Sequence, residues 1–109
     1  MEKILWISLL YDFYGQLLTE KQRKFIELYY NNDLSLGEIA LEYSVTRQAV
    51  YDILKRSEKT LNNYEGKLGL VSKFMEERNK REKALMLLKK FREDNDINCI
   101  DKLEKILKG

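Results

Sequence analysis

Histidine and proline are absent from this sequence of 109 residues, and cysteine occurs once, at Cys99. Without histidine or a second cysteine, the chain lacks the usual ligands of zinc and redox metals and the commonest catalytic base. A single cysteine excludes an internal disulfide and is typical of a reducing compartment. We therefore expect a cytoplasmic protein in which Cys99 is a small, buried apolar residue.

Long hydrophobic runs and nucleotide-binding loops are also missing. Residues 4–11 are apolar apart from Ser8, but this run is too short to span a bilayer and lacks the features of a signal peptide, so we expect no membrane insertion. Gly66-Lys67 stands without the other residues of a phosphate-binding loop. We predict that the protein is not an enzyme and has no cofactor.

The absence of proline and the presence of only five glycines favour long, uninterrupted helices. Apolar spacing and capping residues predict an all-α fold of five to six helices in a single domain, 1–109, with a C-terminal helical extension over about 70–109. Residues 76–83 contain no apolar side chain and form either an exposed helix or a hinge. The predicted helices are 3–14, 20–31, 36–43, 47–67, 70–92 and 97–107.

The first of these helices is apolar around most of its circumference. Only Ser8 and Asp12 leave a narrow polar stripe, so the helix should be buried on more than one side. In a domain this small, such a helix indicates a partner subunit, although a membrane-surface helix is the alternative. We prefer the core or a dimer interface, because no basic face flanks the apolar residues.

A helix-turn-helix motif is predicted over about 35–56. Ser35 with Glu38 forms a capping box at the start of its first helix, and Thr46 caps the second. Small and apolar residues occupy the positions at which two helices cross around a tight turn. The alternative is an ordinary antiparallel helix pair that uses alanine for packing. The predicted motif core is Ile39, Ala40, Tyr43, Val45, Val50 and Ile53.

The exposed face of the second helix, 47–56, is the candidate recognition surface. Its N-terminal residues suit base edges and the later cations suit phosphates, whereas Asp52 would repel phosphates. The alternative is a solvated or protein-binding face on the same fold. The candidate nucleic-acid ligands here are Arg47, Gln48, Tyr51, Lys55 and Arg56.

Charge is distributed unevenly along the chain. Residues 1–56 hold 7 Lys and Arg against 8 Asp and Glu, which weakens the case for strong nonspecific DNA binding. Residues 73–92 hold 8 basic side chains against 3 acidic ones, and this stretch binds RNA phosphates or forms a solvated face. The candidate phosphate ligands are Arg78, Lys80, Arg81 and Lys83.

Three segments carry a family resemblance, namely 18–30, 34–40 and 45–52. Together they resemble the YlxM family, whose members are similar to region four of bacterial sigma factors. The resemblance implies a bacterial cytoplasmic protein of the signal recognition particle pathway, with the particle's GTPase subunit or its RNA as partner. It supplies no catalytic residues.

Three functional hypotheses follow. The first is a non-enzymatic accessory or regulatory protein of the signal recognition particle, acting through its RNA or its GTPase. The second is a transcriptional regulator that binds DNA with the 47–56 recognition helix. The third is a protein-interaction module that forms a homodimer through the first and last helices.

Overall fold

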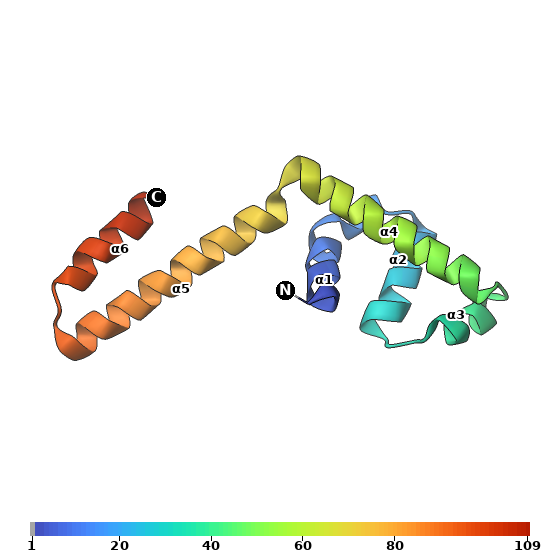
Figure 1. The fold of residues 1–109 in the computed structure, drawn as a ribbon, viewed down its shortest axis with the longest axis horizontal. Coiled ribbons are helices and arrows are strands. Elements are labelled where there is room, and N and C mark those ends of the chain that lie inside the picture. The colour runs from blue at the N-terminus through green and yellow to red at the C-terminus, as the bar shows by residue number, and fades with distance from the viewer. Residues whose placement is uncertain (1) are drawn as a thin grey trace. The chain divides into compact units, whose positions relative to one another are not determined.

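The computed structural model describes residues 2–109, and every regular element in that range is helical (Figure 1). The chain divides into two compact units, the first ending at Val71 and the second beginning at Ser72. The all-α prediction is confirmed. The single domain proposed for 1–109 stays a prediction, although the unit boundary falls close to residue 70, where the C-terminal extension was expected to begin.

The first unit is built around one long helix, against which the other helices pack. Tyr14, Phe25, Ile39, Val50 and Leu61 are fully buried and come from four different helices, so they form one shared core. The elements of this unit are α1 (Lys3–Tyr14), η1 (Gly15–Leu17), α2 (Glu20–Ile26), η2 (Glu27–Asn31), α3 (Leu36–Tyr43) and α4 (Arg47–Leu68).

Side-chain caps begin three of these helices, and those at Ser35 and Thr46 are the ones predicted above. Thr19 and Ser35 each form a complete capping box, with Gln22 and Glu38 respectively. The Thr46 hydroxyl accepts a hydrogen bond from the backbone N–H of Ala49 at 3.0 Å. Each cap satisfies backbone donors that have no partner within the helix.

The turn of the helix-turn-helix motif, between α3 and α4, contains a residue with a left-handed backbone conformation. Ser44 ends α3 with φ 54° and ψ 44°, a conformation that glycine adopts at lower cost. The Val45 N–H then donates to the Ala40 carbonyl at 3.0 Å, which closes the turn before α4 begins. The helix-turn-helix therefore forms where the sequence placed it.

The helix predicted over 20–31 departs from regular α geometry. α2 ends at Ile26, and the chain continues through η2 as a wider π-type turn, in which the Asn32 N–H donates to the Glu27 carbonyl at 3.0 Å. Leu28 is buried inside this turn. The wider turn keeps the chain helical up to Asn31, so the predicted end point is correct.

The predicted motif core needs one correction. Ile39, Ala40 and Val50 are buried, and Val45 and Ile53 are half-buried. Tyr43 instead lies at the surface with 36 % of its area exposed, although its ring contacts Phe25 of α2, which lies in the core.

The first helix is covered on one side only. Ile7, Leu10 and Tyr14 are buried against the rest of the unit, whereas Ile4 and Leu5 remain more than half exposed. The prediction that α1 is buried on more than one side is therefore not met within one chain.

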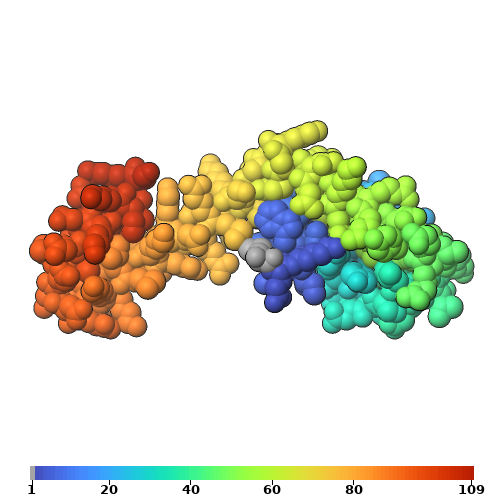
Figure 2. All heavy atoms as spheres, in the orientation of Figure 1, coloured from blue at the N-terminus to red at the C-terminus, as the bar shows by residue number. Residues whose placement is uncertain are grey.

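The second unit is a helical hairpin. α5 (Leu70–Asp94) runs without interruption through 76–83, so this stretch is an exposed helix and not a hinge. After Asn95, which has φ 52°, α6 (Asn98–Lys108) follows, and the Asp96 carboxylate accepts from the Asn98 N–H at 3.0 Å. In Figure 2 the atoms of α6 (red) lie against those of α5 (orange), and Ala84 and Cys99 are the buried residues described in this unit.

Among residues 2–109, no helix has the length and apolar character that crossing a membrane requires.

Candidate nucleic-acid interface

The five candidate ligands of the recognition helix all lie on the surface of α4. Arg47, Gln48, Tyr51, Lys55 and Arg56 are exposed along its first three turns. The buried side of the same helix carries Val50 and Leu54, which anchor it to the core. A helix anchored in this way can present its outer side chains without cost to the fold. The structure therefore brings this predicted set together on one element.

Asp52 lies at the centre of this surface and organises its neighbours. The Gln48 side-chain amide donates to the Asp52 carboxylate at 2.9 Å, and Arg56 Nε donates to the Asp52 backbone carbonyl at 3.4 Å. The carboxylate would repel a phosphate, but it can accept a hydrogen bond from the amino group of cytosine. The arrangement thus suits contact with base edges at Gln48 and Asp52 and with phosphates at Arg56.

Lys55 is exposed but also makes two contacts within the protein. Its ammonium lies 5.5 Å from the Tyr51 ring centroid and 3.8 Å from Glu58 Oε1. Glu58 also pairs with Lys3 at 3.0 Å and accepts from the Tyr30 hydroxyl at 2.9 Å. The nearby Lys3 ammonium lowers the pKa of Lys55. Lys55 therefore shares its acidic partner Glu58 with Lys3.

Arg47 lies over the first turn of α3. A Cβ atom on Gly37 would lie 3.8 Å from Arg47 Nε, so the guanidinium stem passes directly above that glycine. Ser35 caps this same turn. Arg47 consequently places a cation beside a helix N-terminus, where the helix dipole also favours negative charge.

One further cation of this surface was missed. Lys59 is exposed one turn beyond Lys55 on α4. The spacing of four residues from Lys55 is the signal that could have identified it, but the motif was taken to end at Arg56. With Lys59, the exposed side of α4 carries cations over two consecutive turns, at Lys55 and Arg56 and then at Lys59.

The second predicted set is arranged differently. Arg78, Lys80, Arg81 and Lys83 are all exposed on α5, but consecutive helical positions are about 100° apart, so these side chains point in several directions. Arg78 Nε pairs with Glu82 Oε1 at 3.2 Å. Lys80 and Arg81 border a shallow depression whose floor includes Ala84 and Ile106. The structure therefore does not bring this set together at one point.

Comparison with known proteins agrees with the fold. The family described as "Putative helix-turn-helix protein, YlxM / p13 like" (UPF0122) matches residues 1–108. A UPF0122 protein of Desulforamulus reducens is 56 % identical over 102 residues, covering 94 % of this chain and 87 % of the relative. The UPF0122 protein YlxM of Bacillus subtilis is 47 % identical over 107 residues, covering 97 % of each. The chain therefore belongs to the UPF0122 family of YlxM / p13-like helix-turn-helix proteins.

Proposed function

We propose that this chain is a non-enzymatic accessory or regulatory protein that binds nucleic acid through the exposed side of α4. The observation that carries the proposal is the placement of Arg47, Gln48 and Arg56 on one exposed helix that follows a tight turn. In helix-turn-helix proteins, side chains at the start of the second helix contact base edges, and flanking cations contact phosphates.

The nucleic acid that we propose as partner is the RNA of the signal recognition particle, with the particle's GTPase subunit as the associated protein. The support is the resemblance of segments 18–30, 34–40 and 45–52 to the YlxM family. The proposed compartment is the cytoplasm, where this particle works and where a lone cysteine stays reduced.

Duplex DNA is the second candidate partner. The observation that favours it is the hydrogen bond between Gln48 and Asp52, because this pair presents both an amide and a carboxylate at the centre of the recognition helix. Side chains of these two types distinguish base pairs in the major groove. In this case the protein is a transcriptional regulator that reads a specific site.

One titration series separates the two candidates. Labelled signal recognition particle RNA, an unrelated structured RNA and random duplex DNA are each titrated with the protein at near-physiological salt. Selective binding to the particle RNA supports the first candidate. Binding to duplex DNA with no affinity for either RNA supports the second, and no binding to any of the three overturns the proposal.

Variants then identify the surface that is used. If α4 is the interface, Arg47→Ala and Gln48→Ala should each weaken binding by about 5- to 150-fold, the range of about 1–3 kcal/mol that one base contact contributes. Charge reversal at Arg78, Lys80, Arg81 and Lys83 should then have little effect. The inverse pattern would show that α5, rather than α4, contacts the nucleic acid.

We further propose that two copies associate through the first and last helices. Leu5 on α1 and Leu107 on α6 are 56 % and 72 % exposed, and covering such apolar side chains with a second copy would be favourable. Light scattering over a range of concentrations should show a dimer that Leu5→Gln and Leu107→Gln weaken, whereas Lys102→Gln does not. A monomer mass at every concentration would contradict this proposal.

A further inference from the structure

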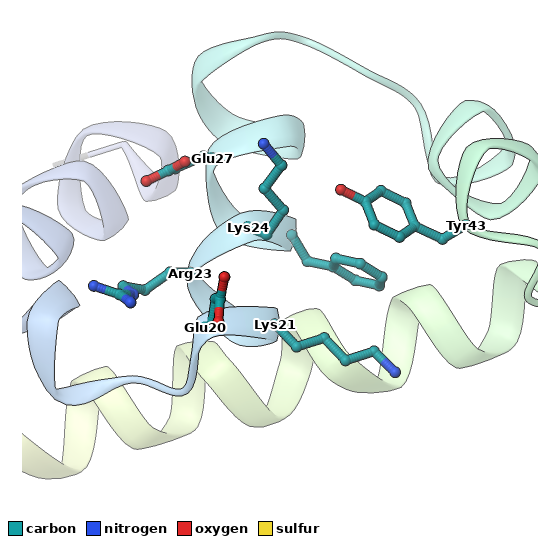
Figure 3. A pocket seen from close by; sticks show the side chains of 7 residues that line it. Glu20, Lys21, Arg23, Lys24, Glu27 and Tyr43 are labelled. Carbon is teal, nitrogen blue, oxygen red and sulfur yellow. The ribbon is translucent and has the colours of Figure 1, made fainter.

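A groove that the sequence did not indicate lies on the outer side of α2. Lys21, Arg23 and Lys24 border it, and Tyr43 at the end of α3 closes one side. Figure 3 shows that Lys24 and Tyr43 extend toward the same part of the groove, whereas Arg23 points away from them. The groove therefore gathers cations and a phenol hydroxyl from two helices of the first unit.

The floor of the groove is rigid. Phe25 is fully buried, and its ring centroid lies 5.0 Å from that of Tyr43 at an interplanar angle of 60°. The Lys21 ammonium lies 6.0 Å from the same Phe25 ring. Because its ring packs against Phe25, the Tyr43 hydroxyl is held in the part of the groove toward which Lys24 extends (Figure 3). Such a group binds a ligand with little further loss of side-chain entropy.

Two carboxylates also border the groove, and their positions limit what it can bind. Glu27 accepts a hydrogen bond from the Tyr11 hydroxyl of α1, so one of its oxygens is engaged away from the lysines. Glu20 lies in the first turn of α2, where the helix dipole stabilises negative charge. The lining still holds three cations, Lys21, Arg23 and Lys24, against these two carboxylates, so the groove keeps a net positive charge.

Lys21 connects this groove to the recognition helix. It also borders a second depression, formed where α2 meets α4, together with Ile53 and Arg56. In Figure 3 the Lys21 side chain extends along α4. Cationic surface thus continues from Arg56 through Lys21 to Lys24.

We infer that the α2 groove binds the phosphodiester backbone of the nucleic acid that α4 contacts, with Lys21 and Lys24 as phosphate ligands and the Tyr43 hydroxyl as a hydrogen-bond donor. The inference rests on the proposed function and extends it to a second element. Lysine ammonium groups and tyrosine hydroxyls are common phosphate ligands in nucleic-acid complexes. An acidic peptide could also pair with the lysines, but continuity with Arg56 favours the backbone of a strand already held by α4.

The experiment compares single variants of the full chain in titrations with labelled duplex DNA and structured RNA between 50 and 200 mM salt. Lys21→Ala and Lys24→Ala should each reduce the slope of log K against log salt by about one on the duplex. Each should also weaken the affinity by the same factor for duplexes of unrelated sequence. Tyr43→Phe keeps the ring and removes the hydroxyl, so it should weaken binding without altering the slope. Lys67→Ala, an exposed lysine near the end of α4, is the matched control and should change neither quantity.

The outcomes separate this inference from the proposed function. If the unmodified chain binds and Arg47→Ala weakens binding while Lys21→Ala and Lys24→Ala leave the slope unchanged, the groove is not a phosphate site but the proposed function stands. If the unmodified chain binds no nucleic acid, both are overturned. A smaller slope of log K against log salt in both lysine variants, with no change in Lys67→Ala, supports the inference that the groove binds phosphate.

Discussion

Replacing Tyr14 by phenylalanine should destabilise the protein through the loss of one buried hydroxyl. This hydroxyl donates to Glu65 Oε1 at 2.6 Å and accepts from the Leu70 N–H at 3.1 Å. The same Glu65 oxygen accepts from the Val71 N–H at 2.9 Å. Tyr14 therefore joins the end of α1 to the last turn of α4 and to the first turn of α5.

The expected loss follows from these contacts. A hydrogen bond to a charged group contributes about 1.5–3 kcal/mol, and phenylalanine preserves the stacking with Tyr64 because the ring is unchanged. We therefore expect Tyr14→Phe to lower the free energy of unfolding by about 2 kcal/mol. For a small domain this corresponds to a decrease in Tm of roughly 8–16 °C, measured by circular dichroism.

Tyr51→Phe is the matched control, because the Tyr51 side chain is 44 % exposed and lies on the surface of α4. Its Tm should change by no more than about 4 °C, since surface substitutions rarely exceed about 0.5 kcal/mol. Equal Tm values for Tyr14→Phe and the unmodified protein would refute the reasoning, because they would mean that the Glu65 contact contributes nothing to stability.

Other predictions test local geometry and titration. Gly66→Ala should raise the free energy of unfolding by about 0.5 kcal/mol in urea denaturation, because nothing lies within 4 Å of the added Cβ in the last turn of α4. Gly69→Ala should lower it by about 1–2 kcal/mol, because φ is +62° there. Thr46→Ala should lower the Tm through a loss of about 1 kcal/mol, since the cap of α4 disappears. Burial, together with a hydrogen bond to Glu27, raises the pKa of Tyr11 to about 12, and burial raises that of Tyr30. The folded-state pKa values of both tyrosines exceed the unfolded value near 10. Their contribution to the free energy of unfolding is therefore complete below pH 10 and is lost as the pH rises toward 12 and beyond. The midpoint of urea denaturation should fall over this pH range.

The helix boundaries were predictable because local signals determine them. Ser35 and Thr46 cap their own helices within three residues, and Gly69 ends α4 in the left-handed conformation with φ 62°. These interactions involve neighbours in the sequence, so the sequence pattern alone identifies them. The left-handed residue Ser44, at the turn between α3 and α4, is likewise a local feature of the chain.

The buried polar contacts were not predictable in this way. Glu58 and Glu65 lie on α4 at positions that a hydropathy pattern assigns to solvent, yet both are 8 % exposed. Their partners Tyr30 and Tyr14 are distant in the sequence, and only the packed fold brings them together. A carboxylate can be buried only when such partners hydrogen-bond to it. The burial of each glutamate therefore cannot be predicted without knowing that a tyrosine lies next to it in the fold.

The candidate site was predictable in its exposed residues but not in its neighbourhood. Helical spacing placed Arg47 and Gln48 on the surface of α4. It could not show that Gln48 and Asp52 bond to each other, since that depends on side-chain rotamers. It also could not place Lys21 beside Arg56, because α2 and α4 meet only through the tertiary fold.

The most direct test of the account is a fluorescence titration of labelled signal recognition particle RNA with the unmodified protein and with an Arg47→Ala, Gln48→Ala double variant. The account predicts selective binding by the unmodified protein over an unrelated structured RNA, and at least about a 5-fold loss of affinity in the double variant. Identical affinities for the two proteins would contradict the claim that the exposed side of α4 binds nucleic acid.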